Sequence, residues 1–139
     1  MSTAMLEAIG SCGLKETITL LGRRTDIDAL MAIGGVLLLT SDREGMPNAV
    51  MEAQLAGLPV VATRSGGIMD CVDHDETGLL ADVGDIEQMV AHCEVLLRDH
   101  QLASRIRAKA LSEVKRRFSK SRMASAYIDL VNFNSHGTD

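Results

Sequence analysis

The chain has 139 residues, of which 46% are hydrophobic and 24% charged, a composition typical of one globular domain. Its longest uncharged run is about a dozen residues, whereas a membrane-spanning helix needs about twenty apolar ones, and its first residues do not resemble a signal peptide. The net charge of −5 and the scarcity of aromatic residues argue against nucleic acid as a partner. We therefore expect a cytoplasmic protein.

The three cysteines, Cys12, Cys71 and Cys93, are widely spaced, and no histidine lies at metal-ligand spacing from them. Disulfides follow oxidising compartments, so isolated cysteines in odd number predict thiols in a reducing compartment. We expect neither a bound metal nor a cofactor.

The N-terminal part of the chain predicts four elements: a helix that ends near residue 12, a strand at residues 17–21, a helix at residues 27–33 and a strand at residues 35–40. Asp26 is a plausible N-cap for the second helix. Residues 17–21 are β-branched and apolar, which favours a strand. The continuous apolar run at residues 35–40 is typical of a strand buried on both faces, as in parallel sheets.

The middle of the chain predicts a further alternation: a helix at residues 48–56, a strand at 59–63, a short helix at 69–72 and a strand at 77–80. Pro47 suits the first helical turn because it has no N–H to leave unpaired. Gly57 is a typical helix stop. Ser65-Gly66-Gly67 predicts a turn, which could either approach a phosphate or serve only as a glycine turn.

The C-terminal part predicts three helices, which begin after Asp85, near residue 102 and after Ser119. Asp85 with Gln88 three residues later resembles a capping box. In the third helix, Met123, Tyr127 and Leu130 would share one face. We expect residues 133–139 to be a flexible tail.

Repeated strand–helix units with apolar strands predict an α/β fold, a Rossmann-like and mostly parallel sheet flanked by helices, with a helical C-terminus. We expect residues 1–139 to form this single domain. Ligands bind such sheets at the carboxyl ends of the strands. The loops at residues 22–25, 41–48 and 63–67 are therefore the candidate ligand loops.

Among these loops, residues 41–48 carry the clearest chemistry. A strand leads into a loop with Gly45, and the loop opens a helix whose free N–H groups and dipole favour an anion such as a phosphate. Glu44 and Glu52 are eight residues apart, roughly 12 Å along a helix, so they predict two acceptors that bracket an extended ligand such as a sugar nucleotide. Spacing alone leaves open a solvated loop carboxylate and a helix-surface carboxylate.

The run from Glu44 to Thr63 has a Glu, seven residues, a second Glu followed by Ala, and then Gly-Leu-Pro-Val-Val-Ala-Thr. With Gly66-Gly67 and Thr77-Gly78-Leu79-Leu80 downstream, it resembles the signature of family 4 retaining glycosyltransferases, which have the two-domain GT-B fold. Upstream, Gly22-Arg23 resembles the family's strand–Gly–Arg element, and Phe118-Ser119 its C-terminal helical region. The resemblance covers about residues 6–131.

The resemblance implies a role for each matching residue. Glu52 would grip the nucleotide ribose, Ser41 would lie beside that ribose, and Glu44, as the catalytic residue, would lie near the donor sugar hydroxyls. The backbone of the loop and helix start would hold the diphosphate and sugar, at Gly45, Met46, Pro47, Asn48 and Ala49. The Gly-Arg element, Gly22 and Arg23, would touch the base. The implied reaction transfers a sugar from a nucleoside-diphosphate sugar to an acceptor hydroxyl with retention and without a divalent metal.

The chain departs from the family in its N-terminal part. The resemblance implies an acceptor-binding N-terminal domain, and two strand–helix units with a basic residue that neutralises the diphosphate, before the first matching residue. Without them this chain would be an incomplete enzyme, and the parent enzyme could be peripheral to a membrane. Arg23, Arg24 and Arg43 are candidates for partial compensation. Because the strand at residues 35–40 would have an open edge, we expect either that residues 17–21 close against it or that two chains associate.

Two other functions stay open at this point: a noncatalytic module that binds a nucleotide or mediates association, and a fragment of a GT-B-fold epimerase acting on a sugar nucleotide. The polar cluster of Asp70, His74, Asp75 and Glu76 fits no metal motif and is interpreted as a solvated loop.

Overall fold

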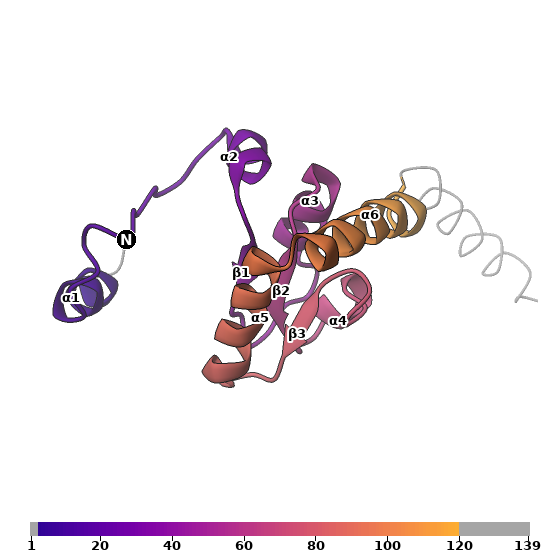
Figure 1. The fold of residues 1–139 in the computed structure, drawn as a ribbon. Coiled ribbons are helices and arrows are strands. Elements are labelled where there is room, and N and C mark those ends of the chain that lie inside the picture. The colour runs from indigo at the N-terminus through magenta and orange to yellow at the C-terminus, as the bar shows by residue number, and fades with distance from the viewer. Residues whose placement is uncertain (1–2, 120–139) are drawn as a thin grey trace, which may run out of the picture.

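A computed structural model describes residues 3–119 of the chain (Figure 1). The helices are α1 (Thr3–Ser11), α2 (Ile27–Ile33), α3 (Asn48–Ala56), α4 (Ile68–Cys71), α5 (Ile86–Arg98) and α6 (His100–Arg117). The strands are β1 (Leu37–Leu39), β2 (Val60–Thr63) and β3 (Leu79–Ala81). No helix within residues 3–119 is both long and apolar enough to cross a membrane.

The three strands form one parallel sheet in the order β1-β2-β3. All four residues of the central strand β2 are buried, as the apolar run predicts. Val60 and Ala62 face a cluster with residues of α2, α3 and α4, whereas Val61 faces a cluster with residues of α5 and α6. Helices therefore cover both faces of the sheet, and the predicted α/β architecture is confirmed.

Several elements begin and end where their end residues predict. Gly57, with a φ of 74°, ends α3 in the left-handed region that glycine adopts freely. Asp85 accepts a hydrogen bond of 2.9 Å from the Gln88 amide at the start of α5, as predicted. The Gln88 side chain does not complete a capping box; it accepts from the amide of Asp82 instead.

Two boundaries differ from the prediction, for local reasons. The helix expected from residue 102 begins at His100, because Asp99 ends α5 and also caps α6 by accepting from the amides of Gln101 and Leu102. Asp26 makes no side-chain cap on α2, because its carboxylate binds the guanidinium of Arg24 at 2.5 and 2.7 Å.

The strand predicted at residues 17–21 is wrong. These residues form no ladder and lie, with α1, well away from the three-stranded sheet (Figure 1). A strand needs a neighbour that takes up its backbone hydrogen bonds, and β-branched residues favour a strand only where they have a surface to pack on. The prediction that residues 17–21 close the edge of β1 is therefore also wrong, and β1 is the outer strand of the sheet. The helix predicted after Ser119 and the tail at residues 133–139 lie outside the described residues.

Candidate functional site

The carboxyl ends of β1 and β2 lead into two loops that lie against each other. Residues 40–47 connect β1 to α3, and residues 64–67 connect β2 to α4. Because β1 and β2 are adjacent and parallel, both loops emerge at the same edge of the sheet. This edge is where a ligand is expected in an open parallel sheet.

A pair of glycines in the second loop allows the first loop to pack closely against it. The Gly67 amide donates a hydrogen bond of 2.8 Å to the carbonyl oxygen of Glu44. A Cβ atom on Gly66 would lie 2.3 Å from the Glu44 carbonyl oxygen, and one on Gly67 would lie 1.8 Å from that of Gly45. No side chain fits there, so Gly66-Gly67 provides the space in which the neighbouring loop packs. The sequence did not indicate this role.

Ser41 is fixed at the base of the same loop. Its carbonyl oxygen accepts hydrogen bonds from the hydroxyl groups of Thr63, at 2.5 Å, and Ser65, at 3.0 Å. Its own hydroxyl donates to Oε1 of Glu44 at 2.7 Å. The carboxylate of Glu44 is thus held by a half-buried network rather than free in a solvated loop.

The start of α3 presents backbone donors. The amides of Asn48, Val50 and Met51 turn back to the carbonyls of Met46 and Pro47. No residue among the described ones accepts from the amides of Gly45, Met46 and Ala49. Pro47 has no N–H, so these three amides are the donors that remain for a ligand. With the helix dipole of the nine-residue α3, they favour an anion.

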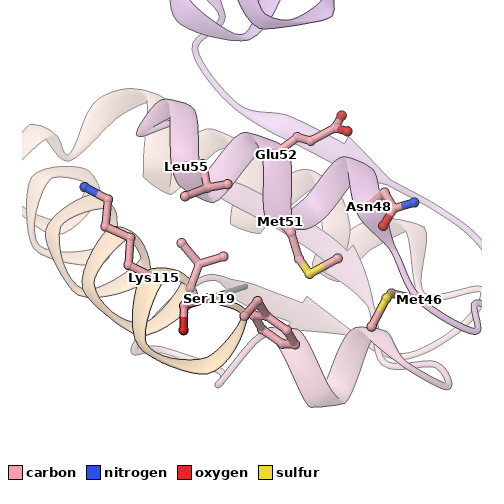
Figure 2. A pocket seen from close by; sticks show the side chains of 9 residues that line it. Met46, Asn48, Met51, Glu52, Leu55, Lys115 and Ser119 are labelled. Carbon is pink, nitrogen blue, oxygen red and sulfur yellow. The ribbon is translucent and has the colours of Figure 1, made fainter. Parts of the chain in front are cut away.

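Glu52 is exposed one turn further along α3 and borders two hollows. The first, a cavity of about 630 Å³ between α3 and α6, is lined by Met46, Asn48, Met51, Glu52, Leu55, Val114, Lys115, Phe118 and Ser119 (Figure 2). The second, of about 570 Å³ between α2 and α3, is lined by Thr25, Ile27, Asp28, Met31, Glu52, Leu55 and Ala56. Figure 2 shows the carboxylate of Glu52 pointing to the side of α3 away from α6. Met46, Asn48 and Glu52 thus meet around one cavity, which Glu44 does not line.

The N-terminal candidate residues lie on the segment that leads into α2. Arg23 lines a separate hollow of about 380 Å³, which shares Thr25 with the hollow beside Glu52. Gly22 lines none of these hollows and has a φ of 63°. The pKa of Arg24 is raised by its hydrogen bond with Asp26, so this cation is already engaged. Arg23 and Arg43 have no ion pair with any residue in 3–119.

Sequence reasoning missed three side chains: Thr63 and Ser65 at this edge of the sheet, and Lys115 further along the cavity, beside Leu55 (Figure 2). Lys115 on α6 is the cation that lines the 630 Å³ cavity. Thr63 and Ser65 anchor Ser41. A signal for the last two was present, since buried hydroxyl residues at the carboxyl end of a strand need an acceptor. Nothing in the spacing of Lys115 on its long helix pointed to the cavity.

The polar cluster after α4 has a structural role. His74 accepts a hydrogen bond of 2.9 Å at Nδ1 from the Leu80 amide, and the carboxylate of Asp73 binds the guanidinium of Arg117. Within residues 3–119, no group of three His, Cys, Asp or Glu side chains is arranged to hold a metal ion. Asp70, Asp75 and Glu76 are exposed, as a solvated loop predicts, whereas His74 binds β3 and the neighbouring Asp73, which was not in the predicted cluster, binds the end of α6.

The chain is similar in sequence to known proteins. The family model described as glycosyl transferases group 1 matches residues 3–113. N-acetyl-alpha-D-glucosaminyl L-malate synthase of Bacillus anthracis is 28% identical over 123 residues, which are 88% of this chain and 32% of that protein. Sulfoquinovosyl transferase SQD2 of Arabidopsis thaliana is 35% identical over 94 residues, 66% of this chain and 18% of that protein. The chain spans about a third or less of these relatives.

Solved structures show the same arrangement. HepE (Alr3699) of Anabaena in complex with UDP has a TM-score of 0.88 and 28% identity, covering 93% of this chain and 36% of that chain. Its complex with UDP-glucose has a TM-score of 0.87. Sucrose-phosphate synthase of Thermosynechococcus elongatus shares the fold, with a TM-score of 0.87 and 20% identity. The match covers 96% of this chain and 34% of that one.

Proposed function

Because the chain belongs to the glycosyl transferases group 1 family, and its fold is that of part of a GT-B glycosyltransferase, we propose that it is the donor-binding half of such an enzyme. Its ligand is a nucleoside-diphosphate sugar. The solved HepE structures, which hold UDP and UDP-glucose, support this class of ligand.

The observation that carries the proposal is the start of α3. Three amides, those of Gly45, Met46 and Ala49, stand unengaged between a held carboxylate on the loop and an exposed one on the helix. In our proposal these amides bind the diphosphate, together with the turn formed by Pro47 and Asn48. Glu52 accepts from the ribose hydroxyls and Glu44 from the hydroxyls of the sugar. Ser41 lies beside the ribose, and Gly22 and Arg23 face the base.

The proposed reaction is transfer of the sugar to an acceptor hydroxyl with retained anomeric configuration. The bond between the anomeric carbon and the diphosphate oxygen breaks, the acceptor hydroxyl oxygen bonds to that carbon from the same face, and the hydroxyl proton passes to the departing diphosphate. Backbone donors preset at the start of a helix stabilise the negative charge that develops on the leaving diphosphate, without a divalent metal. Glu44 is the catalytic residue because it would touch the sugar as charge develops there.

The acceptor is proposed to bind a different part of the enzyme. The chain spans about a third of three curated relatives, so a whole glycosyltransferase has room for an acceptor-binding domain. We therefore propose that residues 1–139 alone bind a donor but transfer no sugar. A reducing, cytoplasmic compartment is part of the proposal. Cys12, Cys71 and Cys93 are all free thiols, which is the state that a reducing compartment favours.

We also propose that two copies of this chain associate through β1. Leu38 on this outer strand is 50% exposed, and it borders an apolar hollow of about 300 Å³ against α5. Residues 34–41 carry no charge, so this edge lacks the Lys or Pro that usually protects an outer strand. A second copy could pair there without bringing like charges together.

A noncatalytic nucleotide-binding module is the second candidate. The observation that favours it is that Glu44, the proposed catalytic residue, does not line the cavity that Glu52 borders. Both candidates predict nucleotide binding, and only the first predicts turnover once an acceptor-binding domain is supplied.

The test is calorimetric titration of the 139-residue chain with UDP, GDP and ADP. Glu52→Ala should weaken the preferred nucleotide roughly tenfold to a hundredfold, the range expected when a charged hydrogen-bond partner is lost. Glu87→Ala, an exposed carboxylate on α5 away from α3, is the matched control and should leave the affinity unchanged. Absence of saturable binding to all three nucleotides, or equal affinities for Glu52→Ala and the wild-type chain, would remove the donor site.

A further inference from the structure

We propose that Thr63 and Ser65 are positioning residues for Glu44. They fix the backbone of Ser41, and through the Ser41 hydroxyl they hold the Glu44 carboxylate ready for the hydroxyl groups of a donor sugar. This inference rests on the proposed function, and it deepens it by assigning recognition of the sugar to a network that spans two loops.

The anchors of the network are buried. Thr63, at the end of β2, is 2% exposed, and Ser65 is 7% exposed. Both hydroxyl groups donate to the same atom, the carbonyl oxygen of Ser41. A carbonyl oxygen has two lone pairs, so these two donors use its full capacity and fix the peptide plane after Ser41.

The fixed peptide sets the direction of the next contact. Ser41 donates through Oγ to Oε1 of Glu44 at 2.7 Å. No other described residue forms a hydrogen bond or ion pair with the second oxygen, Oε2. One carboxylate oxygen is therefore used for orientation and the other remains for a ligand, as recognition of a sugar hydroxyl requires.

A second tether acts on the backbone of Glu44 itself. Gly67 donates its amide to the Glu44 carbonyl oxygen at 2.8 Å. The segment from residue 63 to residue 67 thus holds this loop at two points, Ser41 near its start and Glu44 in its middle. Thr63 and Ser65 bind the carbonyl oxygen of Ser41, and Gly67 binds that of Glu44.

The strand pairing of β2 does not use the two hydroxyl groups. β2 pairs with β1 and β3 through its backbone, with Thr63 in register with Ala81. Removing the hydroxyl groups should therefore leave the sheet intact while the Glu44 side chain samples more orientations. The Ala49 amide and the carboxylate of Glu52 belong to α3, and the Gly67 amide still holds the backbone of Glu44, next to the Gly45 and Met46 amides. Nucleotide binding should therefore persist while recognition of the sugar falls.

The experiment compares UDP with UDP-glucose on the full 139-residue chain, by calorimetry. The readout is the ratio of the two affinities, which isolates the contribution of the sugar. Thr63→Val and Ser65→Ala, singly and together, should lower the preference for UDP-glucose roughly tenfold in the double variant, while affinity for UDP changes less than about twofold.

Conservative variants and a matched control complete the design. Thr63→Ser and Ser65→Thr keep a hydroxyl group and should restore the ratio. Ser104→Ala, an exposed serine on α6, should leave it unchanged. Circular dichroism and thermal melting confirm that each variant is folded; if Thr63→Val is not, the single Ser65→Ala variant still decides.

The outcomes separate the two proposals. Binding of UDP with an unchanged ratio in a folded Ser65→Ala and double variant overturns the positioning role and leaves the donor site standing. Equal affinity of the wild-type chain for UDP and UDP-glucose also overturns it, because no sugar contact then exists to be positioned. A wild-type chain that binds neither UDP nor UDP-glucose overturns this inference, and the donor site falls with it if GDP and ADP also fail to bind.

Discussion

The amide of Gly67 lies 2.8 Å from the carbonyl oxygen of Glu44, across two loops that follow different strands. This contact joins two residues that are 23 positions apart, and the approach is so close that it excludes a side chain at Gly67. The geometry of the loop that precedes α3 therefore depends on a residue outside that loop.

Gly67→Ala should displace this loop. Its Cβ would lie 1.8 Å from the Gly45 carbonyl oxygen, a distance that only backbone movement relieves. We expect a loss of about 2–4 kcal/mol in the free energy of unfolding, as for other overpacked backbone contacts, and a loss of nucleotide binding. Urea unfolding and calorimetry measure the two effects.

Gly45→Ala is the matched control for stability, because its added Cβ would meet nothing within 4 Å. It should change the free energy of unfolding by less than about 0.5 kcal/mol. Equal stability of Gly67→Ala and Gly45→Ala would contradict the packing role that we assign to Gly66-Gly67.

The sequence predicts elements well where their end residues act locally. Gly57 ends α3 through its own backbone conformation, and the apolar residues of β2 are buried in any sheet that places them at the centre. Both features need only the neighbouring residues, so they can be inferred without the rest of the fold.

Features that depend on distant partners were missed or misread. The apolar residues at 17–21 predict a strand, yet no strand lies beside them in residues 3–119 to receive the hydrogen bonds. In the sequence, Thr63 is the end of a predicted strand and Ser65 is part of a predicted turn. Their shared hydrogen-bond acceptor, the Ser41 carbonyl, is more than 20 residues away, so their anchoring role was missed. Glu44 and Glu52 were found as candidates by family resemblance, whereas spacing alone left a surface role open.

His74→Phe should destabilise the start of β3. Nδ1 of His74 is the acceptor for the buried Leu80 amide at 2.9 Å, and phenylalanine fills similar space but cannot accept. A buried donor left without a partner costs about 1–3 kcal/mol. Urea unfolding measures this loss; His100→Phe, at an exposed position on α6, is the control and should be nearly neutral. A neutral His74→Phe would show that Leu80 finds another acceptor.

Glu113 should make stability depend on pH at the acid end. Hydrogen bonds from Arg116, chiefly, and from Arg117 hold the pKa of this carboxyl below its ordinary value. Its folded-state pKa is lower than its unfolded value, so the contribution of the ionised form is present above the ordinary pKa of about 4.3 and is lost as pH falls through the lower folded value.

Thermal melts from about pH 7 to pH 3 test this effect. The midpoint of Glu113→Gln should lie below that of the wild-type chain at neutral pH, and the gap should close as pH falls below the ordinary carboxyl pKa. Glu76→Gln, an exposed loop carboxylate with no ion pair among the described residues, should run parallel to the wild-type curve. A constant gap for Glu113→Gln would assign its effect to packing rather than charge.

Leu38→Lys should abolish association between copies. A lysine on β1 places a strongly hydrated charge on the apolar edge, so pairing with a second strand would require its desolvation. We expect the wild-type chain to shift from monomer to dimer with rising concentration in sedimentation velocity, and the variant to stay monomeric. Met69→Lys, which adds the same charge at an exposed position on α4, should associate as the wild-type chain does. If Met69→Lys also stays monomeric, net charge rather than the β1 edge governs association; a wild-type chain that is monomeric throughout contradicts the proposed pairing.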